Sequence, residues 1–215
     1  MKAGERVVAN DKDSTDYYCV IEDIDSEQVM LKIESFRKCS AELKTKLYLF
    51  QALPKQDKME FIVQKAVELG AHEIIPVASS RCVVKLDDKK RQEKKLARWQ
   101  MIAESAAKQS ARGIIPKVGG IMSFKEAIDY AANLSYSIIP YEHAKGMEES
   151  RQYINEAAEC DSVGIFIGPE GGFEEEEIEY AVKSGIKPIS LGNRILRTET
   201  AGLCVLSILM FKLSE

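Results

Sequence analysis

A glycine-rich, acidic turn lies near the C-terminal end of the chain, in the sequence IGPEGGF at residues 167–173. Glycine-rich turns between a strand and a helix often hold phosphate groups. This one lacks the GK[ST] and GxGxxG spacings, and the carboxylates of Glu170 and of residues 174–177 would repel phosphate oxygens. Its glycines therefore favour close backbone approach of a cationic or neutral ligand. For the four glutamates at 174–177, stabilisation of a helix dipole is a sufficient explanation.

A second loop, LGNRILRTETA at residues 191–201, carries the opposite charge. Arg194 and Arg197 flank an apolar pair, and Glu199 lies where a last helix is predicted to begin. Glu199 is a candidate proton acceptor or orienting group; alternatively, a neighbouring threonine caps the helix and the arginines pair with nearby acids. Ligands bind at the carboxyl ends of parallel strands, so we expect this arginine segment (191–201) and the glycine loop (167–173) to be neighbours.

Alternating strand and helix patterns follow residue 46 and must position these loops. Strands are predicted at 47–53, 73–78, 114–118, 136–140, 163–167 and 188–191. Helices are predicted at 59–69, 88–110, 124–133, 147–159 and 174–184 and from about 199. Residues 57–60 resemble a capping box, and Ser123 with Glu126 is predicted to cap the helix at 124–133. The alternation predicts an α/β domain over residues 46–215, with a parallel sheet covered by helices on both faces.

Residues 1–45 have a different pattern. Short alternating runs between residues 5 and 35 predict three strands joined by hairpins and no helix. Three strands bury little surface, so this region is predicted to be a small β module.

Composition narrows the class of protein. A hydrophobic content of 45% supports a folded core, and the net charge of −4 hides a strongly basic stretch at 81–117, which indicates a polyanionic partner or a solvated helix face. The five cysteines and two histidines are scattered, so we predict no metal site. The apolar run at 203–213 is too short to span a membrane and no signal peptide is visible, so we predict a cytoplasmic protein without membrane contact.

The two loops together resemble the cofactor loops of SPOUT methyltransferases. More narrowly, they resemble the ribosomal RNA small-subunit methyltransferase E family, which methylates N3 of a uridine in 16S rRNA. Further similar motifs are ALPKQDKME at 52–60, QKAVELG at 64–70 leading into EIIP at 73–76, Ser80-Arg81, Arg98-Trp99 and AAKQSAR at 106–112. The resemblance covers nearly the whole chain.

This resemblance implies a fold that periodicity does not show. The C-terminal part of the α/β domain is expected to form a trefoil knot, and the protein is expected to act as a homodimer with its cofactor site at the dimer interface. Family members also carry an N-terminal PUA-like β-barrel that docks RNA. Met1 falls inside that barrel, so residues 1–45 are expected to be a truncated version of it.

The resemblance also implies S-adenosylmethionine as cofactor, with residues 195–196 against the adenine. The implied cofactor-binding residues are Pro140, Tyr141, Ile167, Gly168, Pro169, Glu170, Gly171, Gly172, Leu191, Gly192, Ile195, Leu196 and Arg197. Our candidates for RNA contact are Lys55, Arg81, Gln109, Ser110 and Arg112.

Chemistry suggests roles for three residues. Uridine N3 carries a proton and is a poor nucleophile at neutral pH, so the site must remove that proton or stabilise the resulting anion. Glu199 is a candidate base, and Arg197 or Arg194 is a candidate for stabilising the uracil anion. N3 lies on the pairing edge, so the base must be unpaired or flipped out.

The expected substrate is 16S rRNA, within the assembled small ribosomal subunit. Two alternatives stay open: a SPOUT enzyme that methylates a ribose 2′-hydroxyl or another base, and a non-catalytic RNA-binding factor of ribosome assembly. A nucleotide-dependent oxidoreductase is disfavoured, since no GxGxxG follows the first strand.

Overall fold

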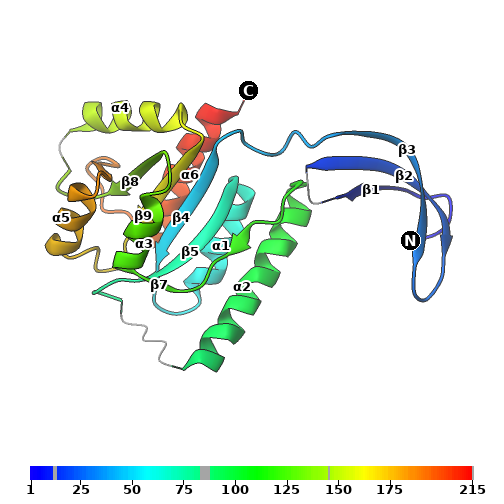
Figure 1. The fold of residues 1–215 in the computed structure, drawn as a ribbon, viewed down its shortest axis with the longest axis horizontal. Coiled ribbons are helices and arrows are strands. Elements are labelled where there is room, and N and C mark those ends of the chain that lie inside the picture. The colour runs from blue at the N-terminus through cyan, green and yellow to red at the C-terminus, as the bar shows by residue number, and fades with distance from the viewer. Residues whose placement is uncertain (12–13, 83–87, 145, 215) are drawn as a thin grey trace. The chain divides into compact units, whose positions relative to one another are not determined.

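The structure, a computed structural model, describes residues 1–11, 14–82, 88–144 and 146–214. The chain divides into two compact units (Figure 1), of which the first comprises Met1–Glu42 and Ala107–Ile115 and the second Leu43–Ala106 and Pro116–Glu215. The segment 107–115, which the sequence pattern places with the second domain, thus belongs to the first unit.

Three antiparallel strands form the sheet of the first unit, in the order β1-β2-β3. They are β1 (Arg6–Asn10), β2 (Thr15–Ile24) and β3 (Val29–Lys38). The carboxylate of Asp25 accepts hydrogen bonds from the backbone N–H groups of Glu27 and Gln28, at 2.7 and 2.8 Å, and so shapes the β2–β3 turn. Cys19 and Ile21 are buried, whereas β3 is exposed along its length. The three strands predicted from the alternation are present.

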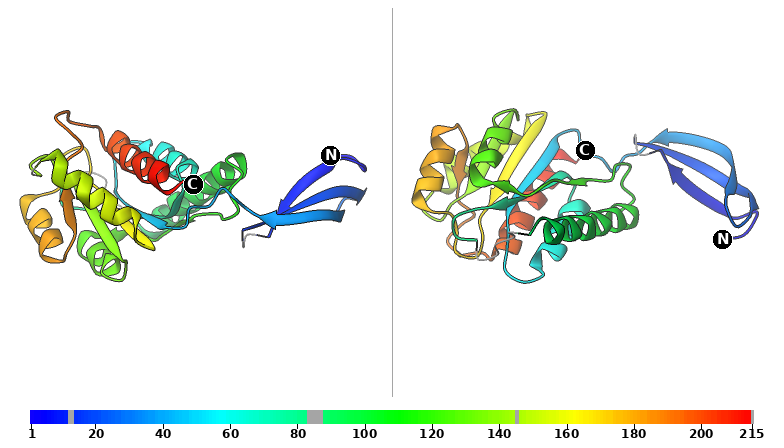
Figure 2. Two further views of the ribbon diagram at one scale, coloured as in Figure 1. Left: turned by 90° about the horizontal axis from the view of Figure 1, so that it is seen from above. Right: turned by 60° about the horizontal axis from the view of Figure 1, so that its bottom comes forward.

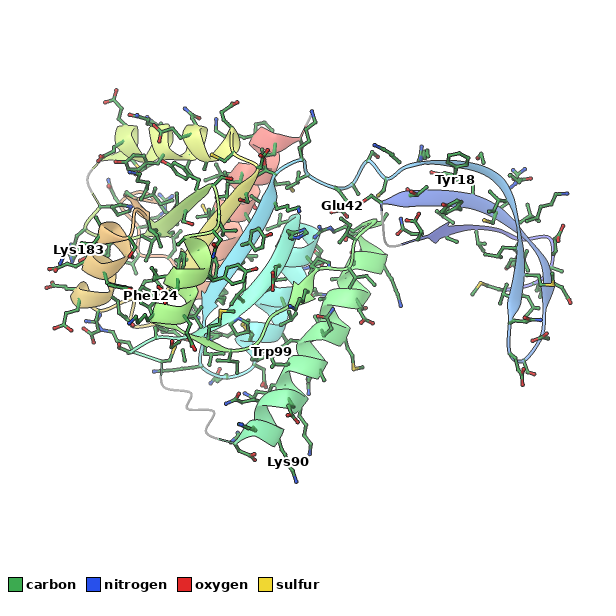
Figure 3. All side chains as sticks on the ribbon, viewed as in Figure 1. Tyr18, Glu42, Lys90, Trp99, Phe124 and Lys183 are labelled. Atoms are coloured by element: carbon green, nitrogen blue, oxygen red, sulfur yellow. The ribbon has the colours of Figure 1, made fainter. Side chains whose placement is uncertain are left out.

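Glu42 and Arg112 form a buried ion pair inside this unit (Glu42 is labelled in Figure 3). Arg112 donates from Nη2 to Glu42 Oε2 at 2.6 Å and from Nε to Oε1 at 3.2 Å, and its side chain is only 3% exposed. The backbone N–H of Ile114 donates to the same carboxylate at 3.1 Å. Glu42 therefore holds residues 112–114 through three hydrogen bonds.

We expect a Glu42→Gln variant to lower the free energy of unfolding by about 2 kcal/mol, because Arg112 loses its charged partner and one of the two carboxylate oxygens to which it donates. Urea denaturation followed by circular dichroism measures the loss. The matched control is Glu34→Gln, since the Arg6–Glu34 pair of the same unit is exposed at 80% and 43%. That change should cost at most about 0.5 kcal/mol. Equal losses in the two variants would contradict the assignment.

The second unit contains a parallel sheet, as the strand–helix alternation predicts. Its strand order is β10-β8-β9-β4-β5-β6, with β7 also paired to β5. The strands are β4 (Lys46–Ala52), β5 (Ala71–Ala78), β6 (Lys117–Val118), β7 (Met122–Ser123), β8 (Tyr136–Pro140), β9 (Ser162–Ile167) and β10 (Lys187–Ile189). The strand predicted at 114–118 is reduced to β6; in the lost part, the N–H of Ile114 donates to Glu42 and Pro116 has no N–H to donate to a neighbouring strand.

Helices cover both faces of this sheet. They are α1 (Lys58–Glu68), α2 (Lys89–Gln109), α3 (Phe124–Ala131), α4 (Met147–Ala158), α5 (Glu175–Lys183) and α6 (Thr198–Leu213). On one face, α3 and α5 bury Phe124 and Ile178 against Phe50 and Phe166, whose rings stack at 4.4 Å. On the other face, α6 packs on α1, β4 and β9. Figure 2 shows the sheet between these two layers.

The start of α3 is capped as predicted, and that of α1 is not. Ser123 and Glu126 form a reciprocal capping box. The capping box predicted at residues 57–60 is wrong: Asp57 makes no side-chain cap, and the Glu60 carboxylate pairs with Arg98 of α2 at 2.7 Å. The Glu60 carboxylate, which a capping box would require, is bound instead to the guanidinium of Arg98 in another helix.

Candidate functional site

Three loops follow the carboxyl ends of β8, β9 and β10. The glycine loop follows β9 and the arginine segment follows β10, and β8 lies between these two strands. The backbone N–H of Tyr141, just after β8, donates to the carbonyl of Ile189 in β10 at 2.9 Å. All three loops thus emerge at one edge of the sheet, where parallel sheets bind ligands.

The glycine loop is a tight turn that needs glycine at two positions for different reasons. Gly172 has φ = 70°, in the left-handed region, and its N–H donates to the carbonyl of Pro169 at 2.9 Å. At Gly168, a Cβ atom would lie 3.3 Å from backbone atoms of Gly172 and 3.3 Å from the ring of Phe173. The loop is therefore closed on itself, and a side chain at residue 168 would require residues 172 and 173 to shift by a few tenths of an ångström.

A buried hydrogen-bond relay joins the glycine loop to the start of α6. The hydroxyl of Thr198 donates to the carbonyl of Gly168 at 2.6 Å and accepts from Gln51 Nε2 of β4 at 2.9 Å. Gln51 is fully buried and Thr198 is 5% exposed. The expected proximity of the two loops is thus achieved by a direct contact. Gln51, 147 residues from Thr198 in sequence, was not predicted.

We expect a Thr198→Val variant to be destabilised by about 2 kcal/mol, because the Gly168 carbonyl and the Gln51 amide lose a partner in a buried place. Chemical denaturation measures the difference. Thr200→Val is the matched control, since Thr200 lies in the same turn of α6 and is exposed. A loss in Thr198→Val no greater than in the control would contradict the relay.

Three acidic side chains in and just after the glycine loop, those of Glu170, Glu174 and Glu177, are paired. Glu170 accepts from Lys58 Nζ at 2.9 Å, and Glu177 accepts from the backbone N–H and hydroxyl of Ser80 at 2.9 and 3.0 Å. Arg81 donates to Glu174 and to the carbonyl of Gly171, both at 2.7 Å, and its hydrogen bond holds the pKa of Glu174 below the ordinary value. Dipole stabilisation alone is therefore an incomplete account of these acids.

Glu199 and the two arginines of the arginine segment differ in their surroundings. Glu199 Oε2 lies 3.3 Å from Lys58 Nζ, and its side chain is 18% exposed. Arg194 and Arg197 are exposed, and within the described part of the chain neither guanidinium group has a hydrogen bond or ion pair. Ile195, expected against adenine, is 90% exposed. The guanidinium groups are thus available to a ligand.

The remainder of the arginine segment is a turn. Gly192 has φ = 98°, and its N–H donates to the hydroxyl of Ser190 at 3.2 Å. Leu191 and Leu196 are half-buried. The left-handed conformation at Gly192 is therefore a third point where the candidate site depends on glycine.

The candidate residues for RNA contact are divided between the two units. Lys55 and Gln109 are exposed, and Ser110 donates to the carbonyl of Ala107 at 3.4 Å. Arg81 and Arg112 are engaged as described above, in different units. The basic side chains of α2 include exposed Lys89, Lys90, Arg91 and Lys94 (Lys90 is labelled in Figure 3), while Lys85 and Asp87 lie outside the described residues.

The described residues contain neither a candidate metal site nor a candidate membrane-spanning helix. No group of three or more His, Cys, Asp or Glu side chains is placed to hold a metal ion. In the same part of the chain, no helix combines the length and apolarity needed to cross a membrane.

Comparison with known proteins identifies the family. The RNA methyltransferase domain family matches residues 41–210. The ribosomal RNA small subunit methyltransferase E of Bacillus subtilis is 35% identical over 99% of this chain and 84% of its own. Its counterpart from Neisseria gonorrhoeae, solved bound to S-adenosyl methionine, is 31% identical with a TM-score of 0.82, over 96% of this chain and 83% of that chain. A Legionella pneumophila methyltransferase solved with the cofactor SAM is 32% identical with a TM-score of 0.83, over 97% of this chain and 84% of that one. This chain belongs to the ribosomal RNA small subunit methyltransferase E family.

Proposed function

We propose that the protein is an S-adenosylmethionine-dependent methyltransferase that methylates N3 of a uridine in 16S rRNA, within the small ribosomal subunit. The observation that carries the proposal is the contact of Thr198 with Gly168, which joins the glycine loop and the arginine segment into one cradle. The chain shares this fold over nearly its whole length with relatives solved with that cofactor.

The residues present fit a bound S-adenosylmethionine. The glycine loop offers backbone at residue 168, where a Cβ atom would press against residue 172. The implied residues of the loop after β8 (140–141), the glycine loop and the arginine segment would hold the cofactor from three sides. When bound, it supplies an electrophilic methyl group, so that an N–C bond forms at uridine N3 as an S–C bond breaks.

The chain's own residues must handle the proton of N3 and the charge that its loss creates. Glu199 is the proposed proton acceptor, and the exposed guanidinium groups of Arg194 and Arg197 are proposed to stabilise negative charge on the uracil oxygens. Glu199 Oε2 lies 3.3 Å from Lys58 Nζ, which fixes the position of the carboxylate at the start of α6. The alignment of nucleophile and methyl group supplies the rest of the rate.

Contacts with RNA are proposed at Lys55, Arg81, Gln109, Ser110 and Arg112, and the three-stranded sheet of the first unit is proposed to be part of a PUA-like RNA-docking module. Exposed Lys55 and Gln109 are free to approach RNA directly. Arg81 and Arg112 would exchange carboxylate partners for phosphate oxygens.

Assembly and topology are proposed from the family. A homodimer is supported by exposed apolar side chains on α1 and α6, with Phe61 at 47% and Phe211 at 81% exposure. A C-terminal trefoil knot, a departure from the usual rule of unknotted chains, would place the arginine segment in the threaded part. A ribosomal substrate implies a cytoplasmic location.

Nucleoside mass spectrometry tests the proposal. Small subunits or naked 16S rRNA lacking the modification are incubated with the protein and S-adenosylmethionine carrying a labelled methyl group. The expected product is labelled 3-methyluridine, with subunits the better substrate. Labelled 2′-O-methyl nucleosides or another methylated base would overturn the N3 assignment. Cofactor binding without any labelled nucleoside would favour a non-catalytic assembly factor.

A further inference from the structure

Lys58, the first residue of α1, bridges the two segments of the candidate site. Its ammonium nitrogen lies 2.9 Å from Oε1 of Glu170 in the glycine loop and 3.3 Å from Oε2 of Glu199 in α6. The three side chains are 25%, 26% and 18% exposed, so solvent screens them only partly. One cation is thus shared between two carboxylates that belong to the two halves of the cradle.

The turn before α1 is built around the same carboxylate. The backbone N–H of Lys55 donates to both oxygens of Glu170, at 3.2 and 3.3 Å. Between Lys55 and Lys58, Gln56 has φ = 58°, a left-handed conformation that is unfavourable for a residue with a side chain. Glu170 therefore anchors both ends of a strained turn, and strain of this kind persists where the surroundings fix it.

Charge on this bridge is maintained near neutral pH. Partial burial opposes ionisation of Glu170, but the hydrogen bonds from Lys58 and the Lys55 N–H hold its pKa below the ordinary value. The hydrogen bond with Glu170 is the main cause that raises the pKa of Lys58. Protonation of Glu170 would weaken the bridge, so the Lys58–Glu170 contact is charged above the ordinary carboxyl pKa and loses its charge as the pH falls through the lowered pKa of Glu170.

The bridge adds a constraint that the buried relay lacks. Thr198 ties the arginine segment to the glycine loop at Gly168, and Lys58 ties the next residue of the helix, Glu199, to Glu170, two residues further along the loop. One link fixes a distance between two segments, whereas two links at successive residues also fix their orientation.

We propose that Lys58 is a positioning residue that holds the glycine loop and the first turn of α6 in the arrangement that receives the methyl donor. The inference rests on the proposed function for the identity of the ligand. The link between the two segments does not depend on it.

Hydrogen exchange of the ligand-free protein, followed by mass spectrometry, tests the link. In Lys58→Met, peptides covering the glycine loop and residues 197–202 are expected to exchange about tenfold faster than in the wild type. Lys58→Arg restores a cation and should bring exchange close to the wild-type rate. The matched control is Lys65→Met, because Lys65 of the same helix pairs with Glu68 at 2.8 Å within α1. It should leave both peptides unchanged.

Calorimetry with S-adenosylhomocysteine tests the consequence for the site. We expect Lys58→Met to weaken binding about tenfold, and Lys58→Arg and Lys65→Met to bind within about threefold of the wild type. If Lys58→Met does not fold, Glu170→Gln keeps the side-chain shape and weakens the same link, because a neutral amide oxygen replaces the carboxylate that Lys58 contacts.

Two results would overturn the proposal: unchanged exchange in both peptides of Lys58→Met, or faster exchange with unchanged affinity. If the wild type itself binds no S-adenosylhomocysteine, the proposed function fails, and the exchange comparison still decides whether Lys58 links the segments.

Discussion

A Gly168→Val variant is expected to bind S-adenosylmethionine about 100-fold more weakly than the wild type, a loss of about 3 kcal/mol. A Cβ atom at residue 168 would lie 3.3 Å from Cα and from the carbonyl carbon of Gly172, and as close to the ring of Phe173. Backbone atoms and a buried ring have less room to shift than the end of a flexible side chain, and valine adds two further methyl carbons. The glycine loop must open to admit them, which moves the backbone proposed to hold the cofactor.

Calorimetry with S-adenosylhomocysteine measures this loss, and circular dichroism checks that the variant is folded. Gly120→Val is the matched control, because Gly120 is exposed and a Cβ there meets nothing within 4 Å. The control should bind as the wild type does. Wild-type affinity in a folded Gly168→Val protein would show that the glycine loop is not the cofactor cradle.

Local patterns were sufficient to predict most elements of the fold. The alternation of strands and amphipathic helices indicates a parallel sheet with two helical layers, and the structure has both. The fate of residues 107–115 was not predictable in this way, because it depends on Glu42. The pair that Glu42 makes with Arg112 joins residues 70 positions apart, and no local pattern records such a partner.

In the candidate site too, features that depend on neighbouring residues could be predicted, and contacts between distant residues could not. The glycine loop could be recognised from composition, since several glycines in one turn demand a backbone explanation. Gln51 and Lys58 were missed, because their roles depend on partners 147 and 112 residues away. Lys58 lies in a stretch that resembles a capping box, and that local interpretation concealed its contact with the glycine loop.

The structure changes the role expected for the acidic residue of the glycine loop, Glu170. From sequence, Glu170 could attract a cationic ligand directly. In the structure its carboxylate is already held by Lys58 and by the N–H of Lys55. Lys58, Glu170 and Glu199 together still carry one excess negative charge. Glu170 thus contributes chiefly to the position of the glycine loop, and the excess charge is shared with Glu199.

The exposed arginines then become the main positive charges available to the substrate base. Arg197 immediately precedes Thr198 and Glu199, and its backbone forms the N-cap of α6. Its neighbour Thr198 is fixed to the glycine loop, whereas the Arg197 guanidinium has no hydrogen bond or ion pair within the described residues. A cation on a fixed backbone with an unengaged head group is suited to a charge that develops only during reaction.

Arg197→Ala should therefore lower kcat for uridine methylation by about 100-fold, the effect typical of removing one group that stabilises a developing anion. The fold should be unaffected, because the side chain is exposed. Single-turnover and steady-state assays on small subunits separate kcat from KM, and Arg151→Ala, which removes an exposed arginine from α4, is the matched control. A raised KM with unchanged kcat would mean that Arg197 grips the RNA equally in the ground state and the transition state. A fall in kcat alone would mean that its charge stabilises the uracil anion as the N3 proton leaves.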